Sequence, residues 1–595
     1  MAESPISLHL ADYGVIAAYF LAMAVIGLRQ SSDSSDSKGF LLGGGNLPVF
    51  ALAVSCLMAA MSAFSLVMVP GEIFDHGLSL WVLNLLTPLC TVAACAVFMR
   101  FYFRIGAFTP FEYLERRYDG RVRTLIAALT IYLRLIYLGM VLFSTSKIFE
   151  GAAGWPAAWT IILCGGVALV FTALGGLKAV VWTDVMQFVL LVGGLFCILG
   201  VLFWKIDGGA VGAVAYALEH ERGPREFSNP GFYTLNPYVR LSFWILLLNM
   251  LTAPITAMAS DQMTVQRLLA SGSYRNAVRT QWLNALLSIP TVLILWVIGL
   301  SVFTFFHQRP ELTVKSGDTA LFTFIATQLP PPLPGLVLAG MLAAVISTLN
   351  AVFNSMAVLY LKEIHIRYLR PDCPEPEQVR VSRRATAAVG LIAVVSGLAI
   401  TLSAEWLRQS VVEAQTIFYA FDAIVIPAFI FAVLSRKASP TLVWVTAGLL
   451  WGLKLAMITW YSASTASANA WTPGGDPGWG GPFNPWLAAA ATLAGGLLFA
   501  GWARLRQSLK YPMISLVAAC SAAGYGLGLA LWAALSRYYY RGEPLALSFQ
   551  WVGFPAIVCY ALIGALWFIF GRPQPATAWR GLTLFDSGEA ESRGK

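Results

Sequence analysis

Charged residues are scarce in this sequence. Asp, Glu, Lys and Arg make up only 12% of its 595 residues, whereas 58% are hydrophobic. A water-soluble chain normally has about 25% charged residues, so the composition excludes an ordinary soluble protein. The sequence therefore predicts a polytopic membrane protein whose surroundings are the lipid bilayer.

Histidine and closely spaced cysteines are also scarce. The five histidines fall in loops or near the ends of apolar segments, and the eight cysteines show no paired short spacing. That cysteine pattern indicates neither a disulfide framework nor a zinc site. A membrane-embedded enzyme needs convergent His, Cys or paired acids within the membrane, so the chain is not expected to be an enzyme.

Two further classes of protein are not favoured. The formal net charge is +9, but Lys and Arg lie in short loops between apolar segments, where they report membrane orientation rather than nucleic-acid binding. A transport-derived sensor should carry a cytoplasmic output domain, and only about 25 residues follow the last apolar segment.

Apolar segments recur along the whole chain and predict about fifteen membrane spans. Loops after odd-numbered spans hold most of the Lys and Arg, as in 100–123 and 362–384. The positive-inside rule then places the N-terminus outside and the C-terminus in the cytoplasm of a cell (inner) membrane protein. The predicted spans are roughly 11–29, 47–73, 78–103, 122–149, 156–174, 180–204, 240–266, 280–306, 333–361, 384–404, 411–434, 441–463, 485–503, 512–536 and 548–570.

The segment Leu333–Lys362 is the most informative span because it carries polar residues at membrane depth. If this segment is a helix, one face of it carries Ser347, either Asn350 or Ala351, and Asn354. Thr348 lies beside this stripe. Such hydroxyls can supply neutral oxygens to a small cation once backbone carbonyls complete its shell. They can equally allow close helix packing or bond to their own helix.

Three other segments combine polar residues with helix-breaking signals. Ser55–Glu72 is rich in small and hydroxyl residues and contains Pro70, so a helix there can lose backbone hydrogen bonds. Gly175–Gln187 begins with a Gly-Gly pair that ends one helix and places Asp184 inside the next span, where an acid needs a nearby cation. Ser260–Arg267 ends a span with a polar cluster facing the cytoplasm, which capping and loop contacts could also explain.

Together these segments resemble the sodium:solute symporter family, which includes sodium/glucose, sodium/proline, sodium/monocarboxylate and sodium/sialic acid cotransporters. Residues 175–187 are similar to the family signature at nearly every position. Asp261-Gln-Met-Thr-Val-Gln-Arg267 and Ala343-Ala-Val-Ile-Ser-Thr348 follow at the expected places. The resemblance covers roughly residues 8 to 435.

The resemblance implies an all-α polytopic membrane protein with a LeuT-type five-plus-five inverted-repeat core, one leading helix and about four trailing helices. Because five spans is an odd number, a second repeat of five must begin on the opposite side of the membrane. The expected division is a leading helix and loop (1–46), the first repeat (47–204), an extracellular loop (205–239), the inverted repeat (240–434), and extra helices with a short cytoplasmic tail (435–595). Function as a monomer is expected.

The resemblance also implies a sodium site between the first and eighth core helices. Its ligands would be the carbonyls of Met58, Met61 and Ala344 and the hydroxyls of Ser347 and Thr348. Asp184 matches an acid near the inward exit of the ion. The second sodium site of some relatives would fall on Asn350 and Ala351, where one ligand is changed and one is lost.

Substrate contacts in the family map onto uncharged side chains here: Ser62, Ser65, Asn84 and Thr87. Arg134, inside the third core helix, lies at a position similar to that of a carboxylate-binding arginine in sialic acid symporters. A guanidinium in a span is costly without an anionic partner. One hypothesis is that Arg134 binds a substrate carboxylate. The alternative is that its side chain extends toward the membrane surface or pairs with a fixed acid such as Asp261.

The sequence therefore predicts sodium-coupled symport of a small polar organic solute by alternating access. A carboxylate-bearing solute, such as a sialic-acid-like sugar acid or a monocarboxylate, is the first hypothesis. The alternative is a neutral sugar or polyol, with Arg134 in a structural role. A polytopic membrane enzyme or a transport-derived sensor is the alternative from another class.

Overall fold

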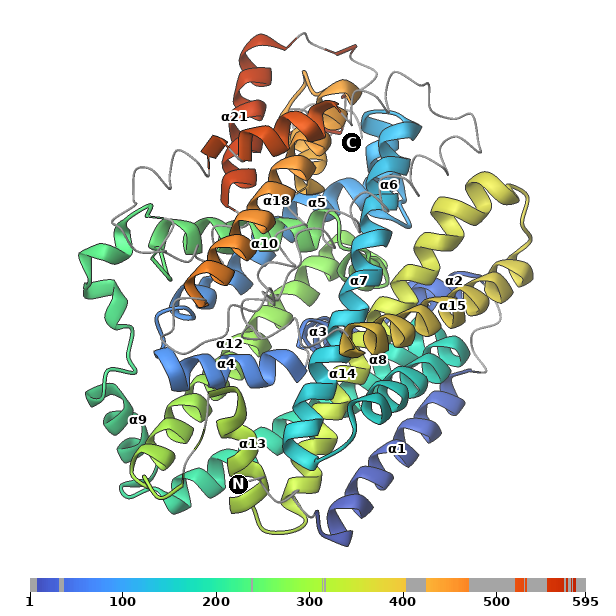
Figure 1. Cartoon of the computed structure of the whole chain (residues 1–595). Helices are drawn as coiled ribbons and strands as arrows, with labels where there is room; N and C mark the ends of the chain where they lie inside the picture. The colour runs from blue at the N-terminus through green and yellow to red at the C-terminus, as the bar shows by residue number, and fades with distance from the viewer. Residues whose placement is uncertain are drawn as a thin grey trace. The chain divides into compact units, whose positions relative to one another are not determined.

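The computed structural model describes residues 8–31, 37–61, 63–236, 239–312, 314, 317–402, 424–469, 519–528, 530–531, 554–571, 574–575, 579 and 582–584. These ranges form helices and connecting turns, and no strand occurs within them (Figure 1). The chain divides into two compact units. The first unit comprises Met1–Phe103, Arg134–Asn229 and Gln262–Leu402, and the second comprises Arg104–Leu133, Pro230–Asp261 and Ser403–Lys595.

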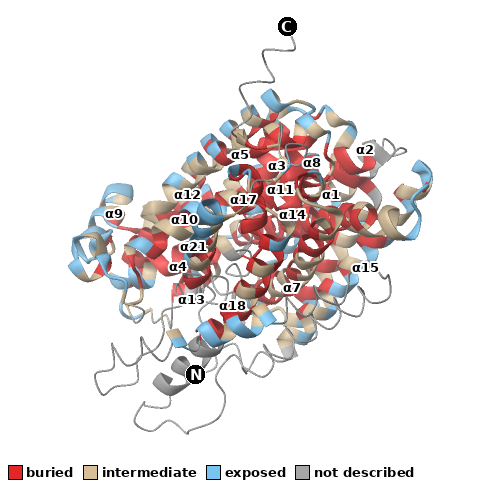
Figure 2. Cartoon of the chain, turned by 90° about the horizontal axis from the view of Figure 1, so that it is seen from above, coloured by how far each residue is buried: buried red, intermediate tan, exposed pale blue. Residues whose placement is uncertain are grey.

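The first unit is organised around helix α14, Leu333–Leu359. In the spanning window of this helix, 94% of the residues are buried, and Figure 2 shows it in red among its neighbours. It packs against helices α8 (Ala157–Lys205), α1 (Leu10–Ser31) and α15 (Glu375–Leu402). Glycines bring α14 and α8 together, since a Cβ on Gly340 would lie 3.2 Å from Leu191 Cα, as is common between membrane helices.

The first core span is broken near its middle. Helix α3, Val49–Ala60, ends before Met61, whose φ of −88° and ψ of 100° are extended. Helix α4 begins at Ala63 and runs to His76, and the two are bent by 57°. The loss of helical structure predicted in Ser55–Glu72 is therefore confirmed, but it falls at Met61, while Pro70 lies inside α4.

The Gly-Gly pair marks the reversal between the two parts of α8. Gly176 has φ 59° and ψ −165°, which residues with a side chain rarely adopt. A Cβ at this position would also lie 2.8 Å from the Phe40 carbonyl oxygen. The predicted spans 156–174 and 180–204 are thus two helices joined at this glycine.

Helices α11, α12 and α13 of the first unit pack against the broken span. Helix α12, Tyr274–His307, contacts α3, α4 and α8, and the short helix α11, Gln262–Leu269, contacts α3 and α14. Helix α13, Gly317–Gln328, packs against α4. Further helices are α2 (Ser37–Leu42), η1 (Gly43–Gly45), η2 (Val82–Leu86), α5 (Thr87–Ile105) and the part of α7 (Gly120–Ala153) from Arg134 onward.

The segment 205–239, expected to be a loop, contains a helix. Helix α9 spans Gly209–Glu219 and buries Ala213 and Ala217, which are four residues apart and so lie on one face. This face packs against α12 and α8. Two short helices, η3 (Arg225–Ser228) and η4 (Pro230–Tyr233), follow it.

The second unit holds helices α6 (Pro110–Arg117), α10 (Phe243–Ala259), α17 (Ile426–Leu434), α18 (Pro440–Asn469) and α21 (Phe554–Phe570). Arg117 is only 1% exposed. Its guanidinium donates to the Ala432, Ser435 and Ala438 carbonyls. Because the last carbonyls of a helix have no partner within it, Arg117 satisfies the C-terminal end of α17.

Seven described helices are long and apolar enough to cross a membrane, or nine if each bent pair is one span, and they fall on predicted spans. Helices α2, α6, α9 and α13 lie between the predicted spans. Shorter apolar helices Leu10–Ile26, Ala157–Ala173 and Pro555–Phe570 match three further predictions. The predicted spans 411–434, 485–503 and 512–536 lie wholly or partly outside the described residues.

We expect Gly176→Ala to destabilise the protein. The positive φ and the contact with Phe40 should cost about 1–3 kcal/mol, which lowers the melting temperature of the purified protein in detergent. Gly166→Ala in the same helix is the matched control, since no atom lies within 4 Å of its added Cβ. Equal melting temperatures for the two variants would contradict the assignment of the reversal to Gly176.

Candidate functional site

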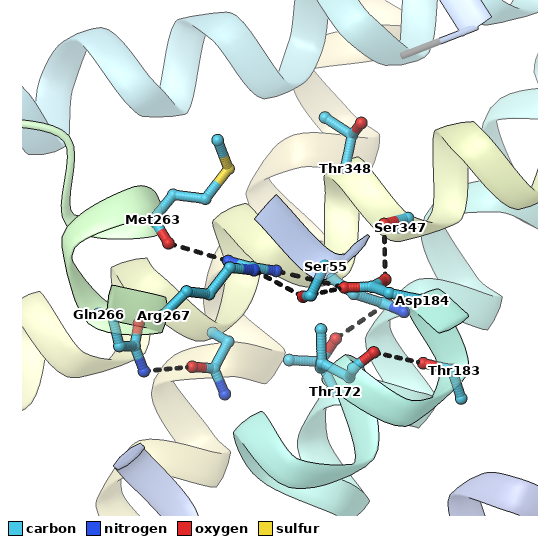
Figure 3. Close-up of polar contacts among 12 residues, drawn as sticks. Ser55, Thr172, Thr183, Asp184, Met263, Gln266, Arg267, Ser347 and Thr348 are labelled. Carbon is cyan, nitrogen blue, oxygen red and sulfur yellow. Dashed lines mark hydrogen bonds and ion pairs between the residues drawn. The ribbon is translucent and has the colours of Figure 1, made fainter. Parts of the chain in front are cut away.

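The polar residues of α14 all lie in the buried interior of the first unit. Ser347, Thr348 and Asn350 are 0% exposed, Asn354 is 2% and Ser355 is 1% exposed. Buried polar groups need hydrogen-bond partners, and Figure 3 shows that neighbouring helices supply several of them. The stripe predicted from helical spacing is therefore a contact surface between helices.

Asp184 is the centre of the polar network. It lies in the second part of α8 and is 0% exposed. One carboxylate oxygen accepts a hydrogen bond from Ser347 Oγ at 2.6 Å, and the other accepts one from Ser55 Oγ. Arg267 Nη2 lies 3.6 Å from the second oxygen. The cation that the sequence required near Asp184 is thus Arg267.

Arg267 reaches this acid from α11, a helix that is buried at nearly every position. Its Nε donates to Ser55 Oγ at 2.8 Å, and its Nη1 donates to the Met263 carbonyl at 2.9 Å. The pair Asp184 and Arg267, with Ser55 and Ser347, therefore joins helices α3, α8, α11 and α14 (Figure 3).

Thr348 brings together three of the five predicted sodium ligands. Its Oγ1 lies 3.1 Å from the Ala344 carbonyl, in its own helix, and 3.4 Å from the Met61 carbonyl at the break after α3. The first contact is the back-bonding common for Thr in membrane helices. The second contact joins α14 to the break after α3, the two elements on which the predicted sodium ligands lie. Met58 lies fully buried in the last turn of α3.

The amide residues of the stripe are occupied by other contacts. Thr172 Oγ1 donates to Asn350 Oδ1 at 2.9 Å, and Gln266 Nε2 donates to Asn354 Oδ1 at 2.6 Å. Gln266 Nε2 also donates to the Leu41 carbonyl. These bonds connect α14 to α8 and α11, so Asn350 and Asn354 contribute to helix packing.

The predicted substrate residues are more dispersed. Ser62 lies outside the described residues, and Ser65 is half-buried in α4. Asn84 lies in η2, and Thr87 begins α5, with Thr87 Oγ1 3.5 Å from Asn84 Oδ1. Arg134 is half-buried in α7, with its guanidinium carbon 5.6 Å from the centre of the Tyr137 ring. Asp261, considered as a partner for Arg134, belongs to the second unit.

The roles of Ser55 and Arg267 were not predicted from the sequence. A signal for Arg267 was present, because the segment Ser260–Arg267 ends in a basic residue next to an apolar span. Ser55 had no distinguishing feature among the small residues of its segment. Their connection to Asp184 spans 129 and 83 positions of sequence, which spacing arguments within one helix cannot reach.

We expect Arg267→Met to destabilise the protein strongly, because it leaves the Asp184 carboxylate buried without its cation. Breaking one side of a buried pair costs about 3–5 kcal/mol, whereas replacing both sides is often nearly neutral. The double variant Arg267→Met with Asp184→Asn should therefore recover much of the melting temperature measured in detergent.

The half-exposed pair Lys147 and Glu150 serves as the control. Lys147→Met, measured in the same way, should change the free energy of unfolding by less than about 1 kcal/mol. If Arg267→Met melts like the unmodified protein, the buried pair does not stabilise the first unit.

The sequence is similar to those of known sodium-coupled transporters. The model of the sodium:solute symporter family matches residues 40–452. The chain is 24% identical over 417 residues to the sodium/sialic acid symporter SiaT of Proteus mirabilis, covering 70% of this chain and 81% of that protein. It is 29% identical over 392 residues to the sodium-dependent multivitamin transporter of Oryctolagus cuniculus, covering 64% of this chain and 60% of that protein.

A solved structure gives the same fold. The chain aligns with a Na⁺-coupled sialic acid symporter in a substrate-bound outward-open state with a TM-score of 0.67 at 20% identity, over 83% of this chain and 98% of that one. The all-helical, inverted-repeat architecture predicted from the sequence is therefore confirmed. The relatives are transporters, not enzymes. The family match spans most of the chain, and the protein belongs to the sodium:solute symporter family.

Proposed function

We propose that the protein moves a small carboxylate-bearing solute into the cell together with sodium, by alternating access between the two sides of the membrane. Sodium coupling follows from the family. The solute class, the direction, the ligand residues, the repeats at 47–204 and 240–434, and an inner-membrane location with the N-terminus outside are our inferences. The chain would act as a monomer.

The observation that carries the sodium assignment is the group of oxygens around Thr348. Its hydroxyl lies within 3.4 Å of the Met61 and Ala344 carbonyls, so a helix break and the central helix meet at neutral oxygen atoms. In our proposal Ser347 and the Met58 carbonyl complete the shell. Neutral oxygens around a single charge give the modest affinity that a coupling ion needs in order to leave again.

Asp184 gives this site a negative charge close to one ligand without being a ligand itself. Asp184 accepts a hydrogen bond of 2.6 Å from Ser347 Oγ. An ion that binds the Ser347 oxygen must therefore weaken or reorient this hydrogen bond. We propose that Asp184 and Arg267 set the position of Ser347 and help the ion to leave toward the cytoplasm. This role fits an acid near the exit path.

The carboxylate assignment depends on Arg134. It is the charged residue among the proposed substrate positions, and Ser62, Ser65, Asn84 and Thr87 are neutral groups suited to hydroxyls or amides. A guanidinium binds a carboxylate through two parallel hydrogen bonds. Relatives named as sialic acid symporters and monocarboxylate transporters, which carry acids, support this solute class.

Removing the two hydroxyls of the sodium site should weaken sodium binding. Each polar contact is worth about 1–3 kcal/mol, so Ser347→Ala with Thr348→Ala should raise the sodium half-saturation of uptake into proteoliposomes at least about tenfold. Thr348→Val alone keeps the side-chain shape and leaves the bond to Asp184 intact, so it tests the ligand without disturbing the acid.

Ser355→Ala is the matched control. Ser355 lies on the same helix and is as buried as Ser347, but its hydroxyl donates to the Val352 carbonyl of its own helix. It should leave sodium dependence unchanged. If the double variant is produced in normal amounts and keeps the sodium half-saturation of the unmodified protein, the site lies elsewhere.

Arg134 variants test the solute. Uptake of labelled sugar acids and monocarboxylates should be lost in Arg134→Ala and strongly reduced in Arg134→Lys, which keeps the charge but not the planar fork. Sodium binding without solute should change little in either variant. Transport of a neutral sugar by the unmodified protein, or full acid uptake by Arg134→Ala, would favour a neutral solute and a structural Arg134.

A further inference from the structure

A second group of ligand-type side chains lies at the end of the central helix, away from the sodium site. Helix α14 continues directly into a π-helical segment, Tyr360–Leu369, which carries His365. Cys373 follows in the next turn, and Glu377 lies in the first turn of α15. One ligand atom from each of these three residues lies within 4.8 Å of the other two.

His365 contributes a ring nitrogen to this group, and its ring lies 6.2 Å from the Tyr360 ring, centre to centre. The Arg370 amide donates to the His365 carbonyl at 2.8 Å. This bond to the residue five positions earlier has the spacing of a π-helix. His365 Nε2 is buried and has no hydrogen-bond partner among the described residues. A buried ring nitrogen without a partner costs free energy unless something else satisfies it, and a bound metal ion would do so.

The other two residues are also positioned for a ligand. Cys373 is 6% exposed, its thiol is free of any disulfide, and its carbonyl accepts a hydrogen bond from Gln378 Nε2 at 2.8 Å. Glu377 pairs through one carboxylate oxygen with Arg370, which fixes the carboxylate and leaves the other oxygen available. Such a supporting partner is usual behind a metal-binding carboxylate.

We propose that His365, Cys373 and Glu377 form a zinc site that joins the end of the central helix to the start of α15. Thiolate, imidazole and carboxylate are the ligands that zinc prefers, whereas magnesium and calcium require oxygen ligands. Tetrahedral coordination places ligand atoms about 3.3 to 3.8 Å apart, so only small side-chain rotations are needed. Water would supply the fourth ligand.

Zinc binding changes the charge at Cys373. The thiol proton is released to solvent as the Cys373 sulfur–zinc bond forms. The cation also offsets the repulsion between thiolate and carboxylate. The cysteine spacing in the sequence does not reveal this site, because only one of its three ligands is a cysteine.

The test is metal binding to the purified full-length chain, prepared without a polyhistidine tag, reduced and stripped of metal. Calorimetric titration with Zn²⁺ should give one equivalent per chain. Co²⁺ in place of zinc should show a cobalt–thiolate absorption band. Cys373→Ser should abolish that band and weaken zinc binding at least about tenfold, and Glu377→Gln should weaken it by a similar factor.

Matched controls separate this site from adventitious binding. Cys197→Ser removes a partly buried thiol in α8, and Glu375→Gln removes an exposed acid near Glu377 in α15. Both should leave the affinity and the cobalt band unchanged. The proposal is overturned if the unmodified chain shows no cobalt–thiolate band, or if Cys373→Ser binds zinc as tightly as the unmodified chain. Sodium dependence and solute uptake do not enter this test, so its result is independent of the proposed function.

Discussion

The buried pair of Asp184 and Arg267 is the interaction on which the centre of the first unit depends. Both side chains are almost completely excluded from solvent, where an unpaired charge would cost several kcal/mol. Each compensates the other, and the hydroxyls of Ser55 and Ser347 complete their hydrogen bonds. Because the four residues come from four helices, the pair fixes how these helices meet.

Helix α14 both packs against its neighbours and carries the proposed sodium ligands. It is buried on all sides, so each polar side chain on it must be satisfied by a neighbouring helix or by its own backbone. This requirement leaves Ser347 and Thr348 little freedom, and fixed oxygen atoms are what an ion site needs. The same helix continues to His365, so a metal ion bound there would also act on the element that carries the proposed sodium ligands.

Much of the architecture could be predicted because the bilayer imposes strong constraints. Long apolar segments can only be helices in a membrane, and the long apolar helices that the structure describes fall where hydropathy places them. The reversal at Gly176 was also predictable from its Gly-Gly pair. The helix α9 was not, since a short helix with small apolar residues in a connecting segment resembles a loop. The break at Met61 carried no local breaking residue, so the family resemblance was needed to place it.

The sequence by itself determined the membrane class, the family, the polar stripe on α14 and the long apolar helices that the structure describes, because these depend on composition and on spacing along one helix. Only the tertiary structure decided which partners satisfy that stripe. Arg267 reaches Asp184, Thr348 reaches Met61, and His365 reaches Cys373 and Glu377 through the packing of separate elements. A buried polar group needs a partner, but its own sequence neighbourhood does not specify which distant residue the fold will bring to it.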